Sequence, residues 1–115
     1  GLVDAGGVQW GVVRLDGLDM QGLRDLSGRV KSLSTDLAVA LVSSAEGGVP
    51  FIVLSQGLSQ ERGVRAGALA KELGSHIGGG GGGRDDAGQG QGTKPEAIDA
   101  ALEWASGRFL ELLSS

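Results

Sequence analysis

The 115-residue chain carries a net charge of −4 and only 3% aromatic residues, so we expect one compact domain with a largely aliphatic core. The absence of cysteine excludes disulfides, thiolate catalysis and cysteine-based zinc sites. No apolar run approaches the roughly 20 residues that a membrane span needs, and no signal-peptide pattern opens the chain. Residues 1–7 are interpreted as a linker at the domain edge, and residues 8–115 as a single domain.

The first half of the chain predicts a strand, a helix and a hairpin. Residues 10–15 are rich in valine and flanked by glycines, as is typical of a strand. Asp19 is a candidate N-cap for a helix with apolar residues at steps of three and four. Two apolar runs, 37–42 and 50–55, joined by a glycine turn, predict an antiparallel pair buried on both faces. The apolar positions of the helix are Met20, Leu23, Leu26, Val30 and Leu33.

The second half predicts two helices separated by a glycine-rich loop. The first helix spans about 62–76, with Val64, Leu69, Leu73 and Ile77 inward. Irregular structure is expected over 78–92. Thr93, Pro95 and Glu96 form a capping box for the last helix, whose apolar stripe is Ile98, Leu102, Ala105, Phe109 and Leu112. The fold class is therefore α/β or α+β, a small mixed sheet flanked by helices on both faces, in the order β-α-β-β-α-glycine loop-α.

Six consecutive glycines, 78–83, lead into Arg84, Asp85 and Asp86. Glycines leave backbone N–H groups uncovered by side chains, and exposed amides beside a guanidinium can hold a phosphate oxygen. A flexible linker is the alternative interpretation. Residues 62–84 carry a local charge of +3 and residues 85–115 one of −4, so a basic face at the loop is compatible with the acidic total.

Other sites find little support in the sequence. A phosphate-binding P-loop needs lysine and Ser/Thr after its last glycine, where this chain has Arg84 and Asp85. His76, the only histidine, is expected in a last helical turn, favourably placed in the helix dipole. Asp85 and Asp86 lack the further oxygen ligands of a calcium site. Because no nucleophile, base and orienting group can be assembled, we expect no catalytic site here.

The segment from Arg62 through Ala66 and Gly67 to the loop 78–89 resembles the DHHA1-type domain that closes alanyl-tRNA synthetases, the C-Ala domain. That family shows a basic residue, an Ala-Gly helix start and a loop of the form GGxGGGRPDxAQxGG. The preceding strand, helix and hairpin occur in the same order, so the resemblance covers the chain from about Val8 onward. This chain departs from the family loop at Gly80, Asp85, Ala87 and Gly88, which lowers the positive charge at the expected RNA face.

The resemblance implies a tRNA-binding domain that contacts the outer corner of tRNA, where the D and TψC loops meet. Aminoacylation and editing, with their ATP, Mg and Zn, would reside in other domains of an alanine–tRNA ligase, and this domain would hold no cofactor. We expect the cytoplasm, or alternatively the mitochondrial matrix, and no membrane partner. The expected nucleic-acid contacts are the amides of Gly78, Gly79, Gly80, Gly81, Gly82 and Gly83, with Arg84, Arg62, Arg65, Lys71 and Gln89.

Two other functions stay open at this point. Related DHHA1 domains end phosphodiesterases that grip single-stranded nucleic acid. The acidic last helix, over 94–115 with Trp104 on its flank, also suits a protein-interaction or homodimer surface.

Overall fold

The computed structural model describes residues 2–114 and contains one mixed sheet with helices. The elements in chain order are β1 (Val3–Ala5), β2 (Val8–Arg14), α1 (Met20–Val30), β3 (Leu37–Val42), β4 (Val49–Gln56), α2 (Leu58–Glu61), α3 (Ala66–His76), β5 (Gly80–Gly83), β6 (Ala87–Gly92), the 3-10 helix η1 (Pro95–Ala97) and α4 (Ile98–Leu113).

The sheet has the strand order β1-β2-β3-β4-β6-β5. Strands β2 and β3 are parallel, and every other neighbouring pair is antiparallel. The predicted antiparallel pair is confirmed as β3 and β4, with Leu37 opposite Gln56 and Val42 opposite Phe51. Every residue of β3 is buried, because helices cover both faces of the sheet as expected.

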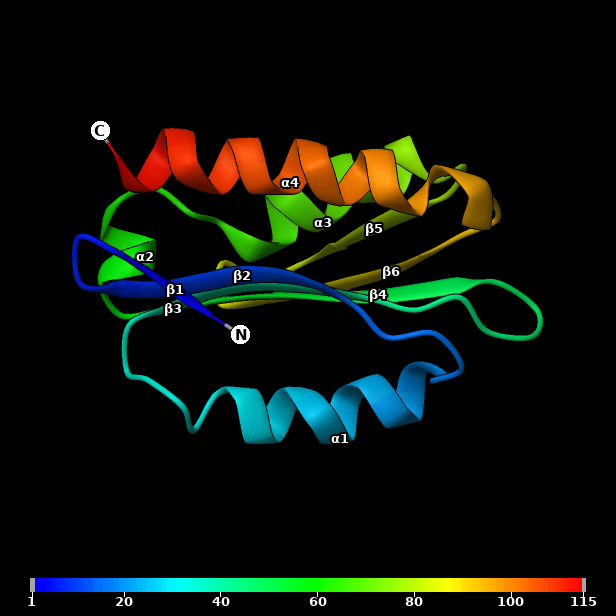
Figure 1. Cartoon of the computed structure of the whole chain (residues 1–115), viewed down its shortest axis with the longest axis horizontal. Coiled ribbons are helices and arrows are strands. Elements are labelled where there is room, and N and C mark those ends of the chain that lie inside the picture. The colour runs from blue at the N-terminus through cyan, green and yellow to red at the C-terminus, as the bar shows by residue number, and fades with distance from the viewer. Residues whose placement is uncertain (1, 115) are drawn as a thin grey trace.

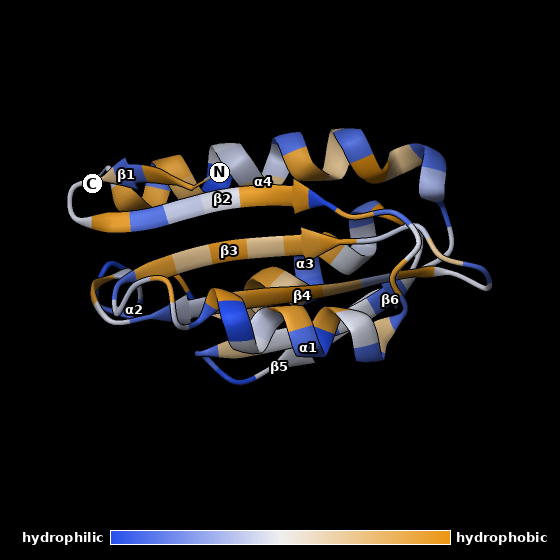
Figure 2. Ribbon diagram, turned by 60° about the horizontal axis from the view of Figure 1, so that its bottom comes forward, coloured by the Kyte–Doolittle hydropathy of each residue, from blue (hydrophilic) through white to orange (hydrophobic). Residues whose placement is uncertain are grey.

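Helix α1 lies on one face of the sheet, and α3 and α4 lie side by side on the other (Figure 1). Two apolar cores result. The larger includes Phe51 and Phe109 and fills the α3–α4 side, whereas the smaller includes Leu23 and Ile52 and lies under α1. The hydropathy colouring in Figure 2 follows this arrangement, with β3 and β4 mostly apolar and β5 paler. Among the described residues, no helix combines the length and apolarity that crossing a membrane requires.

The predicted first helix is confirmed, including its cap. The Asp19 carboxylate accepts a hydrogen bond of 2.8 Å from the Gly22 N–H. Leu33, expected on the apolar stripe, instead lies beyond the helix end and is 66% exposed.

The helix predicted over 62–76 is divided. Residues Leu58–Glu61 form the short α2, and α3 begins only at Ala66. Gly63 between them has φ +87°, a conformation that ends a right-handed helix. The inward positions Val64, Leu69, Leu73 and Ile77 are nonetheless buried as predicted.

Three further expectations are corrected. Residues 3–5 form β1 and pair with β2, so part of the expected linker belongs to the sheet. The irregular loop expected over 78–92 is instead largely the β5–β6 hairpin. The capping box does not form, because the Thr93 hydroxyl donates to the Gly78 carbonyl at 2.8 Å and α4 follows η1 without a side-chain cap.

Candidate functional site

The second part of the glycine tract, Gly80–Gly83, forms β5, which is one of the two edge strands of the sheet. The Arg84 N–H donates to the Ala87 carbonyl at 3.0 Å and closes a tight turn at Asp85 and Asp86. Because hydrogen-bonded and non-bonded pairs alternate in an antiparallel ladder, the N–H groups of Gly80 and Gly82 point toward β6 and that of Gly81 points to the open edge. These glycines therefore do not present one continuous row of free amides.

The N–H of Gly79, just before β5, is also hydrogen-bonded within the protein. It donates to the Gly74 carbonyl at 2.8 Å, at the end of α3. Part of the amide surface expected from the sequence is thus used inside the protein, and the unpaired part lies along the edge of β5.

One face of the hairpin has glycines because α3 lies directly on it. A Cβ on Gly74 would come within 2.6 Å of the Gly80 carbonyl carbon, and one on Gly81 within 2.7 Å of the Ala70 carbonyl oxygen. On β6, a Cβ on Gly90 would meet the Phe51 ring tip at 2.5 Å. Real Cβ atoms do not approach backbone this closely, so packing accounts for the glycines on this face.

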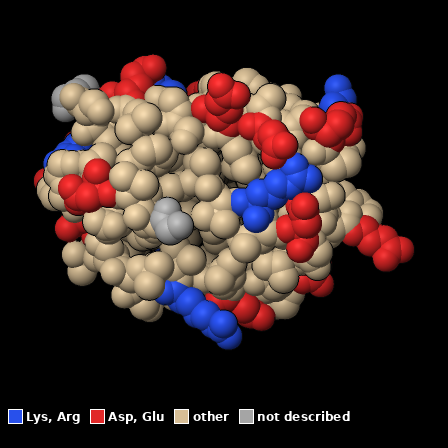
Figure 3. Space-filling view, in the orientation of Figure 1, with Lys and Arg blue, Asp and Glu red and all other residues tan. Residues whose placement is uncertain are grey.

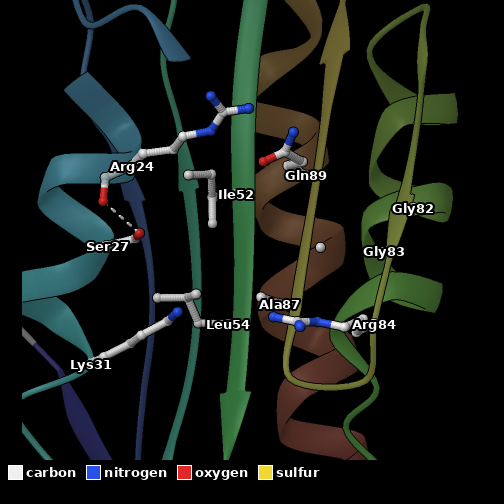
Figure 4. A pocket seen from close by; sticks show the side chains of 11 residues that line it. Arg24, Ser27, Lys31, Ile52, Leu54, Gly82, Gly83, Arg84, Ala87 and Gln89 are labelled. Carbon is white, nitrogen blue, oxygen red and sulfur yellow. Dashed lines mark hydrogen bonds between the residues drawn. The ribbon is translucent and has the colours of Figure 1, made fainter. Parts of the chain in front are cut away.

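The opposite face of the hairpin is open. A Cβ on Gly80 or Gly82 would meet no described atom within 4 Å. Between this face and α1 lies a groove of about 530 Å³ over β4 (Figure 4). It is lined by Arg24, Ser27, Lys31, Ile52, Leu54, Gly82, Gly83, Arg84, Ala87, Gly88 and Gln89.

The groove is basic. Figure 4 shows Arg24 and Lys31 extending from α1 toward β4, and Arg84 extending back across Ala87 from the hairpin turn. No carboxylate occurs among the described residues that line it. The Arg84 side chain is 81% exposed, and within the described part of the chain it forms one ion pair, at 3.3 Å, with the half-exposed Asp86. Such an exposed pair contributes about 0–1 kcal/mol, so the guanidinium remains available to a ligand.

The other predicted cations occupy different places. The Arg62 guanidinium donates to the carbonyls of Ala5, Gly6 and Leu113, so it ties α2 to the ends of the described chain and does not join the groove. Arg65, at the N-cap of α3, is exposed. It lies beside the hairpin turn, because the N–H of the next residue, Ala66, donates to the Asp85 carbonyl.

Lys71 and Gln89 lie on opposite sides of the hairpin. Lys71 is exposed on α3, which covers the hairpin from the other face. Gln89 projects beside the groove (Figure 4). Sequence reasoning thus brings Arg84, Gln89 and part of the glycine tract together, but it missed Arg24 and Lys31. Both are basic residues between the apolar positions of the helix predicted after Asp19, so the sequence places them on its polar face.

Acidic side chains are distributed over the surface and are not confined to one layer. Figure 3 shows Asp and Glu at several separate places on the visible face. Those of α4 are Asp99, Glu103 and Glu111. The Arg14 guanidinium, at the end of β2, donates hydrogen bonds to the nearby Asp16 carboxylate at 3.0 Å and to the Asp99 carboxylate of α4 at 2.9 Å. These two hydrogen bonds, first to Asp16 and then to Asp99, raise the pKa of Arg14.

His76 ends α3 as expected, and its ring lies 4.6 Å from that of Trp104. Within residues 2–114, no cluster of three or more His, Asp or Glu side chains suits a metal ion.

Known proteins are similar to this chain in sequence, and residues 7–111 match the family model of the DHHA1 domain. An alanine–tRNA ligase from Acidothermus cellulolyticus is 40% identical over 106 residues, and alanine–tRNA ligase 1 from Lachnoclostridium phytofermentans is 36% identical over 104 residues. Each alignment covers 90% of this chain but only 12% of the relative.

The fold has a counterpart among solved structures. The crystal structure of the C-Ala domain from Aquifex aeolicus alanyl-tRNA synthetase superposes with a TM-score of 0.81 at 23% identity. The match covers 100% of this chain and 99% of that one. The sheet order, the two helical layers and the glycine hairpin therefore make up a C-Ala fold.

Proposed function

Because this chain belongs to the DHHA1 domain family, we propose that it is the C-terminal tRNA-binding domain of an alanine–tRNA ligase. The relatives named alanine–tRNA ligase support the parent enzyme, and the C-Ala fold supports the place within it. Aminoacylation and editing, with their ATP, Mg and Zn, would then be carried out by other domains. The role of this domain would be to bind tRNA at its outer corner.

The observation that carries the proposal is the exposed Arg84 at the tip of a glycine hairpin, above a groove lined by cations. A guanidinium gives a phosphate two parallel N–H donors, and a strand without side chains lets an RNA backbone approach closely. Folded RNA is recognised largely by shape and by sugar and phosphate contacts, which suits such a surface.

The net charge of −4 does not oppose this assignment. Charges beyond about 8–10 Å are largely screened at physiological ionic strength. Helix α4 lies on the opposite face of the sheet from α1 (Figure 1), whereas the groove lies on the α1 side. Of the three cations that line the groove, Arg84 is paired with Asp86, and Arg24 and Lys31 form no ion pair with the described residues. The groove therefore keeps a local positive charge for a nucleic acid.

A binding assay with two RNAs tests the proposal. Wild-type protein should shift full-length tRNA(Ala) more strongly than an acceptor minihelix, which lacks the D loop and therefore the outer corner. Arg84→Gln should weaken tRNA binding about tenfold, because a charge-assisted phosphate contact is worth roughly 1.5 kcal/mol. Arg29→Gln removes an exposed arginine outside the groove and serves as the control. Equal binding of the two RNAs would rule out the outer corner, and unchanged affinity in Arg84→Gln would remove Arg84 from the interface.

The two other functions stay predictions. Competition of short single-stranded RNA with tRNA for the protein tests the phosphodiesterase-like alternative. Sedimentation measures the molecular mass in solution and so tests a homodimer through α4, on which Leu110 is 44% exposed.

A further inference from the structure

We infer that the groove between α1 and the β5–β6 hairpin holds a ribose–phosphate segment of one RNA strand, with Gly82 as its floor and Arg24 and Lys31 opposite Arg84. This inference rests on the proposed function and identifies which part of the RNA the protein contacts and with which residues.

Gly82 is the first line of support, because folding does not require glycine there. Its φ is not positive, and an added Cβ would meet nothing within 4 Å. Its neighbours Gly81 and Gly83 differ, since Gly81 is pressed against α3 and Gly83 has φ +143°. A glycine in a strand interior costs stability relative to other residues. A bare backbone at the groove floor is explained if another backbone must approach it closely.

The second line of support is the arrangement of charge. Arg24 and Lys31 are seven residues apart, about two helical turns or roughly 10 Å along α1, and both line the groove. Neither side chain forms an ion pair with any described residue. Arg84 contributes a third cation from the hairpin side. Cations on both walls and an uncharged floor fit a strand whose phosphates face outward to the walls.

Gln89 supplies the polar group that a ribose requires. It lies opposite Ile52 in the register of β4 and β6, and it lines the groove beside Gly82. Its side-chain amide forms no hydrogen bond with the described residues. An amide both donates and accepts, so it can pair with a 2′-hydroxyl, the group that distinguishes RNA from DNA.

The first experiment fills the groove without changing charge. Gly82→Val should lower tRNA affinity at least tenfold in a titration at fixed salt, while the melting temperature stays equal or rises because valine favours strands. Gly80→Val is the matched control. Gly80 was expected to contact RNA through its amide, but its N–H points toward β6 and the residue does not line the groove. Because its surroundings on the same strand are equally open, the tRNA affinity of this variant should differ from the wild type by less than twofold.

The second experiment removes the charges of α1. Arg24→Gln and Lys31→Gln should each weaken tRNA binding about fivefold, with Arg29→Gln near wild type. Lys31 is also the C-cap residue of α1, so thermal melting of each variant separates lost binding from lost helix stability.

Gln89→Ala should reduce the preference for the RNA over a DNA molecule of the same sequence.

The outcomes separate the two proposals. If wild-type protein does not bind tRNA, both the proposed function and the groove assignment are overturned. If wild-type protein binds tRNA, and Gly82→Val and the α1 variants bind it equally well, the groove assignment alone is overturned. Loss of affinity in Gly82→Val with normal melting, together with losses in Arg24→Gln and Lys31→Gln, supports it.

Discussion

Gly67→Ala should destabilise the domain by about 3 kcal/mol, although alanine is the better helix former. A Cβ at position 67 would lie 2.6 Å from the Gly83 carbonyl carbon and 2.9 Å from the Arg84 carbonyl oxygen. Both obstacles are backbone, so α3 must lift from the hairpin, and overpacking of this kind typically costs 1–3 kcal/mol. The Gly67 N–H also donates to the Arg84 carbonyl at 2.7 Å, a bond that such a movement weakens. Urea denaturation measures the change.

Gly28→Ala is the matched control and should have the opposite sign. Gly28 lies within α1, and a Cβ there meets no described atom within 4 Å. Helix propensity alone then applies, and alanine should stabilise the domain by roughly 0.5–1 kcal/mol. If Gly67→Ala stabilises the domain as Gly28→Ala does, α3 is not packed on the hairpin as described.

Raising the salt concentration from 50 to 200 mM should lower tRNA affinity roughly 20- to 60-fold. Arg24, Lys31 and Arg84 would neutralise about three phosphates, and each neutralised phosphate releases the counterions condensed on it. The plot of log affinity against log salt concentration should therefore have a slope of about −2 to −3. Removing any one of the three should reduce the magnitude of the slope by about one. Titrations of the wild type and each glutamine variant at four salt concentrations provide the slopes.

Two variants of exposed cations outside the groove check this result. Arg29→Gln should keep the wild-type slope, because Arg29 lies on α1 but does not line the groove. Lys71→Gln tests the rim predicted from the sequence, since Lys71 lies on α3, on the other face of the hairpin. A slope near zero for the wild-type protein would contradict a phosphate-binding groove.

Much of the fold could be predicted from the sequence because its central elements have strong local patterns. The run 37–42 is apolar throughout and the run 50–55 is apolar up to Ser55, as is typical of strands buried on both faces. Asp19 caps α1 through a contact made within its own first turn. These features depend on neighbouring residues or on burial, both of which the sequence records directly.

The glycine hairpin could not be predicted in this way. Glycine has a low strand propensity, so six in succession indicate a loop. The strand forms because β6 pairs with it and α3 packs against it, and neither contact is visible from local sequence. The failed capping box has the same origin, since the Thr93 hydroxyl binds the distant Gly78 carbonyl.

The candidate site was likewise only half predictable. Arg84 and Gln89 follow from their places in the glycine-rich segment. Arg24 and Lys31 are about 60 positions away and reach the groove only because α1 covers the face of the sheet beside β6. Arg62 is the opposite case. It is close to the glycine-rich segment in the sequence, but its guanidinium donates to the carbonyls of Ala5 and Leu113, away from the groove.

Amide chemical-shift mapping with ¹⁵N-labelled protein and unlabelled tRNA locates the contact surface most directly. We predict that the amides of residues 80–89 and of 24–31 shift or broaden as tRNA is added, while those of α4 stay in place. Changes confined to α4, or none at all at saturating tRNA, would contradict an RNA contact at the glycine hairpin.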